Sequence, residues 1–124
     1  MNLLEFLNFA SVLLFGVVLT LSFSGLSFRK NVGQYKSRDM AVNGYFSHTS
    51  PTYGSPFDMM TSQGITYRTA GENIAKNTSV KGAHTAFMNS PGHKANILNK
   101  GFGKVGLGFY QEGQYLYVTQ WFIN

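Results

Sequence analysis

A chain of 124 residues has the length of one domain. Its 44% hydrophobic and 12% charged residues are typical of a globular protein and exclude an intrinsically disordered chain. The net charge of +5 on scattered basic residues would favour anionic cell wall, acidic lipid or nucleic acid about equally, and its simplest interpretation is a solvated, soluble surface. The absence of cysteine excludes disulfides, thiolate metal sites and a cysteine nucleophile.

Residues 1–28 form an apolar N-terminal segment that differs from the rest of the chain. Residues 9–28 carry no charge and have about the length of one membrane span, so they are the segment through which we expect any membrane contact. Three interpretations stay open. A signal peptide is opposed by Glu5, the only early charge; a membrane anchor is opposed by Arg29 and Lys30, which follow it; the third is a strand or helix of the fold.

Two helices are expected in the next part of the chain. The first covers residues 30–43 and ends at Asn43-Gly44. Its apolar face is expected to contain Val32, Tyr35 and Met40. The second begins at Ser55-Pro56-Phe57-Asp58, where a serine cap precedes a proline and an acid. It should direct Phe57 and Met60 inward and end at Gly64, with Ile65 covering the end.

A third helix and a hairpin complete the pattern. The helix is capped by Thr78 or Ser79 and ends at Ser90-Pro91-Gly92, with an apolar face of Val80, Ala83 and Phe87. From residue 103 the apolar period changes to two, and residues 103–122 are expected to form a β-hairpin around Glu112-Gly113. Helices that precede strands in this way indicate an α+β domain with helices covering a sheet.

Three polar runs contain the candidate functional residues. They are Tyr45-Phe46-Ser47-His48-Thr49-Ser50-Pro51, Ala70-Gly71-Glu72-Asn73-Ile74-Ala75 and Asn89-Ser90-Pro91-Gly92-His93-Lys94-Ala95-Asn96-Ile97-Leu98. Two histidines and a carboxylate, His48, His93 and Glu72, could ligate a divalent metal or act as an acid/base set. Their spacing alone is not diagnostic, because it lacks the i, i+4 pair of a helical zinc motif.

Structural roles for the same residues are the alternative. His48 could be a buried histidine that anchors its loop, and Glu72 and Asn73 could satisfy backbone donors in a turn. His93 could be the first residue of a helix, and His84 an ordinary exposed residue. No serine lies in a Gly-x-Ser-x-Gly elbow, so no serine nucleophile is indicated.

The three runs, followed by Val105-Gly106-Leu107-Gly108 and Thr119-Gln120-Trp121-Phe122, occur in one order across residues 36–124. In this order they resemble the bacterial branch of the CAP superfamily (cysteine-rich secretory proteins, antigen five, pathogenesis-related proteins), also called SCP-like extracellular domains. The absence of cysteine fits the bacterial branch, since eukaryotic members are disulfide-rich. We therefore expect residues 29–124 to be a CAP/SCP-like domain.

The resemblance implies a three-layer α-β-α sandwich with a central antiparallel sheet and a shallow cavity. Members of the bacterial branch open with a helix that residues 1–28 do not show, so the first helix is expected to be missing or replaced. In the family a histidine and a glutamate line the cavity, and they match His48 and Glu72. We expect Asn73 and Asn96 to line the same cavity.

This sequence departs from the eukaryotic pattern at two positions. The second glutamate of that pattern falls near Ser90 and the second histidine near Tyr117, which we include among the cavity residues. His93 is expected to take over as the second imidazole. The metal ligands, if zinc or another divalent ion binds, would then be His48 and His93, and no cofactor is required.

Three functions follow from these observations. The favoured one is a secreted or cell-envelope binding module, not an enzyme, whose ligand is a lipid, a cell-wall glycan or a protein. The alternative is a metal-dependent hydrolase or protease with His48 and His93 as ligands and Glu72 as general base. The third is a purely structural role for the polar residues. The sequence contains no phosphate loop and no helix-turn-helix pattern, so nucleic acid is not expected as a partner.

Overall fold

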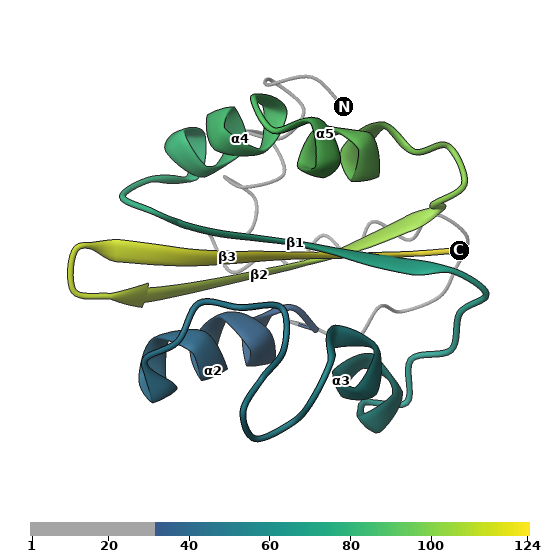
Figure 1. Ribbon diagram of the computed structural model, residues 1–124, viewed down its shortest axis with the longest axis horizontal. Coiled ribbons are helices and arrows are strands. Elements are labelled where there is room, and N and C mark those ends of the chain that lie inside the picture. The colour runs from purple at the N-terminus through teal and green to yellow at the C-terminus, as the bar shows by residue number, and fades with distance from the viewer. Residues whose placement is uncertain (1–31) are drawn as a thin grey trace.

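The computed structural model describes residues 32–124, which form three layers (Figure 1). One outer layer holds the helices α2 (Gln34–Asn43) and α3 (Pro56–Ser62). The other holds α4 (Val80–Met88) and α5 (Pro91–Leu98). The α+β sandwich expected from the sequence is confirmed. The expectations for residues 1–28, including the first helix, lie outside the described residues.

The middle layer is an antiparallel sheet with the strand order β1-β3-β2. Its strands are β1 (Ala70–Asn77), β2 (Lys104–Glu112) and β3 (Tyr115–Ile123). The expected hairpin is confirmed as β2 and β3, joined by a turn in which Gly113 has a positive φ of 58°. In the described part of the chain β3 is therefore the central strand and β1 lies at one edge.

Side chains alternate between the two faces of the sheet, and each face has its own core. Toward α2 and α3, Trp121 packs with Met59 and Met60, while Tyr117 packs with Met40. Toward α4 and α5, the buried residues are Ala75, Ala83, Phe87 and Val118. The sheet is thus covered on both faces by apolar side chains.

The helix ends agree with their sequence signals, but two helix faces do not. Ser55 and Asp58 form a capping box at the start of α3, and Gly44 ends α2 with a φ of 68°. Tyr35, however, is 65% exposed and Phe57 is 44% exposed, so their expected inward positions are wrong. The inner position on α3 belongs to Met59, which lies beside Met60 and about 200° around the helix from Phe57.

Two elements were not expected from the sequence. The run from Ala70 to Asn77 is strand β1, whose central residues are buried on both faces and so show no alternation of polar and apolar types. The run after Ser90, expected to end a helix and form a turn, instead starts helix α5 with Pro91 in its first turn. His84, given above as an exposed residue, is only 2% exposed on α4.

Helix α2 approaches the sheet through a close contact between two glycines, Gly33 before the helix and Gly108 on β2. A Cβ atom at Gly108 would lie 1.9 Å from the carbonyl carbon of Gly33, and one at Gly33 would lie 2.6 Å from the backbone nitrogen of Gly108. Beside this contact, the backbone N–H of Phe109 donates to the side chain of Gln34. The start of α2 therefore lies directly on β2, with no side chain between them.

We expect Gly108→Ala to lower the free energy of unfolding by about 3 kcal/mol, because the added methyl group overlaps the Gly33 backbone and α2 must move. Urea denaturation of the two proteins measures this difference. Gly103→Ala is the matched control, since a Cβ there meets nothing within 4 Å. Equal stabilities for both alanine variants would show that α2 does not depend on the close contact.

Candidate functional site

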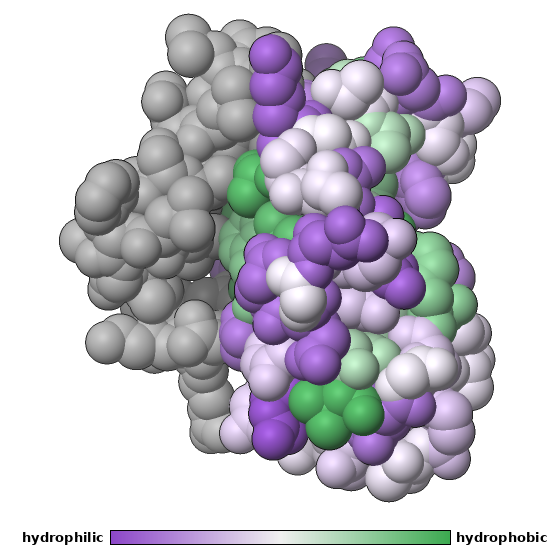
Figure 2. Space-filling model, turned by 90° about the vertical axis from the view of Figure 1, so that its left-hand side faces the viewer, coloured by the Kyte–Doolittle hydropathy of each residue, from purple (hydrophilic) through white to green (hydrophobic). Residues whose placement is uncertain are grey.

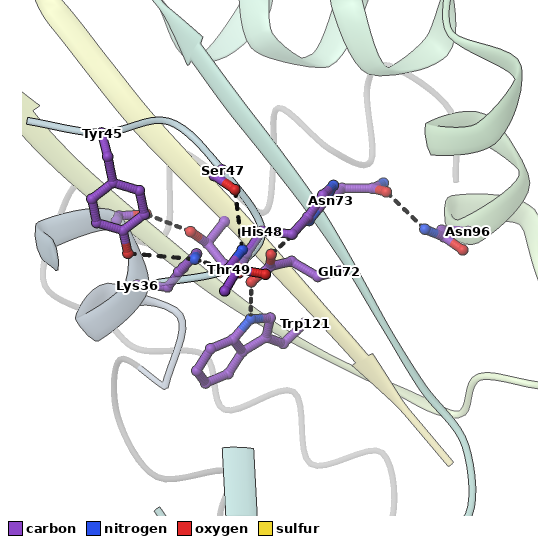
Figure 3. A network of polar contacts seen from close by, with 11 residues as sticks. Lys36, Tyr45, Ser47, His48, Thr49, Glu72, Asn73, Asn96 and Trp121 are labelled. Carbon is purple, nitrogen blue, oxygen red and sulfur yellow. Dashed lines mark hydrogen bonds and ion pairs between the residues drawn. The ribbon is translucent and has the colours of Figure 1, made fainter. Parts of the chain in front are cut away.

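Glu72 is the centre of a polar site on the face of β1 that is covered by α2 and α3. Its side chain is only 1% exposed, yet both carboxylate oxygens have partners (Figure 3). Oε1 lies 2.7 Å from His48 Nδ1, and Oε2 accepts a hydrogen bond of 2.6 Å from the indole N–H of Trp121. Because Glu72 and Trp121 are directly opposite each other on β1 and β3, the sheet register itself forms this pair.

The protonation of Glu72 depends on a balance between burial and its partners. Burial raises the pKa of Glu72 above its usual value. The hydrogen bonds from Trp121 and His48 and the positive charge of Lys36 act in the opposite direction without cancelling it. These three neighbours therefore stabilise the ionised form of the carboxylate against the effect of burial.

His48 lies in the loop between α2 and α3 and joins the buried carboxylate to the surface. Its side chain is 54% exposed, in contrast to that of Glu72. With the proton on Nδ1, the ring donates to Glu72 and leaves Nε2 as a hydrogen-bond acceptor with no bond to the described residues. The carboxylate thus fixes the ring orientation and leaves one ring nitrogen for a ligand.

Lys36, on α2, holds the backbone of this loop from below. The side chain is fully buried, and Nζ donates to the carbonyl oxygen of His48 at 2.6 Å and to the Tyr45 hydroxyl at 3.5 Å. Burial lowers the pKa of Lys36, although the charges of Glu72 and Asp39 act against this. A buried ammonium group therefore supports the residue whose side chain binds Glu72.

Asp39 ties the rest of the loop to α2. Its carboxylate accepts hydrogen bonds from Tyr45, from Ser50 at 2.7 Å and from Asn43 at 2.7 Å. Burial alone would raise the pKa of Asp39, but these hydrogen bonds together with the charge of Lys36 hold it below its usual value. Burial and the hydrogen bond to Asp39 raise the pKa of Tyr45, so its hydroxyl stays a donor. The loop is thus fixed at both ends and in the middle.

Asn73, the next residue on β1, forms a second polar group on the opposite face of the sheet. Its amide nitrogen donates to the carbonyl oxygen of His93 and to the side chain of Gln120, both at 3.0 Å. Its amide oxygen accepts from Asn96 at 2.9 Å (Figure 3). Since His93 and Asn96 belong to α5, this buried amide fixes that helix on the edge strand.

The imidazole of His93 is half-buried at the start of α5. Its ring packs edge-on against Phe87, with 5.2 Å between the ring centroids. Burial, and then the charge of His48, lower the pKa of His93. The bonds that the described residues form with the His48 ring and with the His93 backbone are separate, since one goes to Glu72 and the other to Asn73.

The structure places five of the six cavity residues predicted from the sequence in two separate polar groups, and the sixth in the apolar core. His48 and Glu72 are bonded to each other on the side of α2, whereas Asn73, Asn96 and the backbone of His93 are joined on the side of α5. The sixth, Tyr117, is 6% exposed in the core beside Met40 and Ile74. The strand alternation of neighbours on β1 causes this division.

Three important residues were not identified from the sequence: Lys36, Asp39 and Trp121. The first two lie on the inward face of a helix where polar and apolar residues are mixed, so the apolar pattern alone does not indicate them. Trp121 belongs to one of the runs that carry the family resemblance, but its residue type alone indicates no role. The available signal is the spacing of Lys36, Ser37 and Met40, which places Lys36 and Ser37 on the same face of the helix as the apolar Met40.

The described residues do not fit a three-ligand zinc site. Within residues 32–124 no group of three or more His, Cys, Asp or Glu side chains is placed to hold a metal ion. Catalytic zinc sites use three protein ligands, and both oxygens of Glu72 already have protein partners.

Within residues 32–124, no helix combines the length and apolar composition needed to cross a bilayer.

The part of the chain that resembles known proteins is nearly the same as the part that the structure describes. Residues 31–123 match the family model described as CAP, the cysteine-rich secretory protein family. The chain is 54% identical over 90 residues to the uncharacterized protein YkwD of Bacillus subtilis, covering 72% of this chain and 34% of YkwD. It is 39% identical over 89 residues to the uncharacterized membrane protein YlbC of the same organism, covering 71% of this chain and 25% of YlbC. The chain thus spans about a third or less of these relatives.

Two solved structures are similar to this one. An extracellular protein containing a SCP domain from Bacillus anthracis has a TM-score of 0.68 at 39% sequence identity, covering 75% of this chain and 30% of that protein. An outer surface protein of Borrelia burgdorferi has a TM-score of 0.68 at 18% identity, covering 75% of this chain and 70% of that protein. The latter likeness is one of fold alone.

We expect Lys36→Met to lower the free energy of unfolding by about 2 kcal/mol, because two buried carboxylates lose a cation and the His48 carbonyl loses its donor. The pKa of Glu72 should rise further, since the Lys36 charge now lowers it. A carboxyl with a raised pKa holds its proton more tightly in the folded chain than in the unfolded chain. The stability deficit should therefore be largest above the pKa of Glu72 and shrink as the pH falls through it.

Urea denaturation across a pH series and a carbon-13 NMR titration of the Glu72 carboxyl measure these two effects. Arg38→Met, which removes an exposed cation from the same helix, is the control and should change neither. An unchanged Glu72 titration in a folded Lys36→Met protein would contradict the role assigned to Lys36.

Proposed function

This chain belongs to the cysteine-rich secretory protein family, and we propose that it acts at the cell envelope or outside the cell as a non-catalytic binding module. The ligand contacts the exposed edge of His48, with Glu72 as the buried support of that imidazole. The location is supported by two relatives, one named an extracellular protein and the other a membrane protein.

The observation that carries this proposal is the contrast between the two bonded side chains. Glu72 is 1% exposed and His48 is 54% exposed, so a fixed carboxylate presents an imidazole of defined orientation to solvent. Such pre-organisation lowers the entropy that a binding site loses when its ligand binds. The buried contacts of Lys36 and Asp39 extend the same support to the backbone of the loop.

The arrangement favours binding over the hydrolase that was the alternative from the sequence. A general base needs a lone pair within hydrogen-bond reach of the water it activates. The Glu72 side chain is only 1% exposed and its oxygens are bonded to His48 and Trp121, so it offers no lone pair to a water at the surface. Among the described residues no serine or threonine hydroxyl is bonded to His48, so the nucleophile–base pair of acyl transfer is not formed there.

The ligand is proposed to be a lipid, a cell-wall glycan or a protein, as expected above. We expect the protein to be retained on purified cell-wall sacculi or on phosphatidylglycerol vesicles, and His48→Ala to weaken that retention at least about tenfold, or 1.4 kcal/mol. The melting temperature should fall by no more than about 8 °C, because the ring is half-exposed although Glu72 loses one of its hydrogen-bond partners. Co-sedimentation and a thermal melt measure the two quantities.

Thr61→Ala is the control for this experiment, since it alters an exposed residue of α3. Glu72→Gln should also weaken retention, because the amide nitrogen and oxygen cannot both reproduce the bonds of the carboxylate to His48 and Trp121. Retention equal to that of the wild type, together with a lower melting temperature for His48→Ala, would favour the purely structural role.

Zinc titration tests the alternative function directly. We expect calorimetry to show no one-to-one zinc binding with a Kd below about 10 μM. Only His48 and His93 are candidate ligands, and they belong to the two separate polar groups described above. The His48→Ala and His93→Ala variants are titrated in parallel. Tight binding in the wild type that is lost in both variants would establish a two-histidine metal site and favour the hydrolase.

A further inference from the structure

A long part of the chain contains basic residues and no acidic ones. Between Glu72 and Glu112 the sequence has no aspartate or glutamate. This stretch supplies all of α4 and α5 and the loop that follows them. Three of its lysines are exposed on that layer: Lys81 on α4, Lys94 on α5 and Lys100 in the loop. We call these three residues the basic face.

The aspartate and glutamate side chains of residues 32–124 all lie away from the basic face. Asp39 and Glu72 are buried on the side of α2. Asp58 belongs to the capping box of α3, and Glu112 lies at the hairpin end of β2. Among the described residues none of the three lysines forms an ion pair, because the pair found there is His48 with Glu72. The positive charge of this layer is therefore not neutralised within the described structure.

The positions of these lysines are not explained by helix stability. Lys81 and Lys94 lie near the N-terminal ends of α4 and α5, and the first turns of both helices contain no acidic residue. The helix macrodipole makes this end positive, so cations there are unfavourable and anions favourable. The basic face therefore has a small cost for the fold, which favours a role in recognition.

Apolar surface is concentrated on the opposite layer. Five large exposed side chains, at 44–65% exposure, lie on the side of α2 and α3: Tyr35, Val42, Phe46, Tyr53 and Phe57. The exception on the basic side is Leu98, at 49%. Figure 2 shows a distinct apolar area low on one face of the molecule, on the side of α2, with smaller apolar areas higher up among mainly polar atoms.

This division distinguishes between possible anionic partners. A membrane surface is bound by faces that combine lysine with large apolar side chains, which here lie on opposite layers. Single-stranded nucleic acid needs exposed aromatic rings for base stacking, and α4 and α5 expose none. The three lysines come from three separate segments, which suits an extended anion with several charges better than a small anion. A flexible polymer with recurring phosphate groups meets these conditions.

We propose that the basic face binds a flexible polymer of recurring phosphate groups that carries no bases, and that this contact is independent of the ligand site at His48. Lys81, Lys94 and Lys100 each neutralise a phosphate along the polymer, with release of its counterions. The inference goes beyond the proposed function, because it concerns a different layer of the molecule and holds whatever binds at His48.

The test uses fluorescently labelled long-chain inorganic polyphosphate and the full chain, with anisotropy measured over a series of salt concentrations. The double variant Lys81→Gln/Lys94→Gln should bind about tenfold more weakly at low salt. The slope of log K against log salt should become shallower by about one to one and a half. Arg38→Gln/Arg68→Gln removes two exposed cations from the other side and should bind within twofold of the wild type.

Further measurements distinguish this contact from binding through His48, through net charge, to nucleic acid or to a membrane. His48→Ala should bind polyphosphate as the wild type does, so that failure of the His48 site and failure of the basic face are distinguishable. Equal losses in the two double variants would overturn the proposal, since net charge alone would account for them. Tighter binding of oligothymidine than of polyphosphate at equal charge, or lysine-dependent binding of phosphatidylglycerol vesicles in preference to polyphosphate, would overturn it in favour of nucleic acid or membrane.

Discussion

Two neighbouring residues on the edge strand β1 hold the parts of this structure that carry polar chemistry. Glu72 points toward α2 and binds the His48 ring, and Asn73 points toward α5 and binds the backbone of His93. Each is also bonded to the residue directly opposite it on β3, Trp121 in one case and Gln120 in the other. The position of both histidine-bearing segments therefore depends on the register of β1 against β3.

This dependence explains why the interior contains so many polar groups. Lys36, Asp39, Glu72, Asn73 and Gln120 are all buried. A buried polar group is costly when it lacks a partner, and each of these five has at least one hydrogen bond. Because each of these bonds requires its two partners at short range, the network restrains the loop that carries His48 at residues 45, 48 and 50.

The sequence predicted those features that depend on short local patterns. The hairpin follows from a period of two around Glu112-Gly113, and the start of α3 from a serine, proline and acid in consecutive order. Strand β1 could not be predicted in this way, because both of its faces are buried and its pattern contains no alternation. Helix α5 has no fully buried residue and hence no apolar stripe.

For the site, the resemblance identified His48 and Glu72, which are bonded in the structure, but it could not show that Glu72 and Asn73 face opposite layers. That separation requires knowledge that the segment is a strand. Lys36 was not identified for a related reason. Lysine is among the residues least often buried. The burial of Lys36 depends on two carboxylates, Asp39 on the next turn of the same helix and Glu72 on strand β1.

The bond between Trp121 and Glu72 has a practical consequence for the study of this protein. The chain contains a single tryptophan, and its indole is fully buried with its N–H on the carboxylate that supports His48. Fluorescence excited at wavelengths where the seven tyrosines absorb little therefore arises from one chromophore, located one carboxylate away from the exposed imidazole. The chain thus contains its own optical reporter, and occupancy of the site can be followed in the unmodified protein without an attached dye.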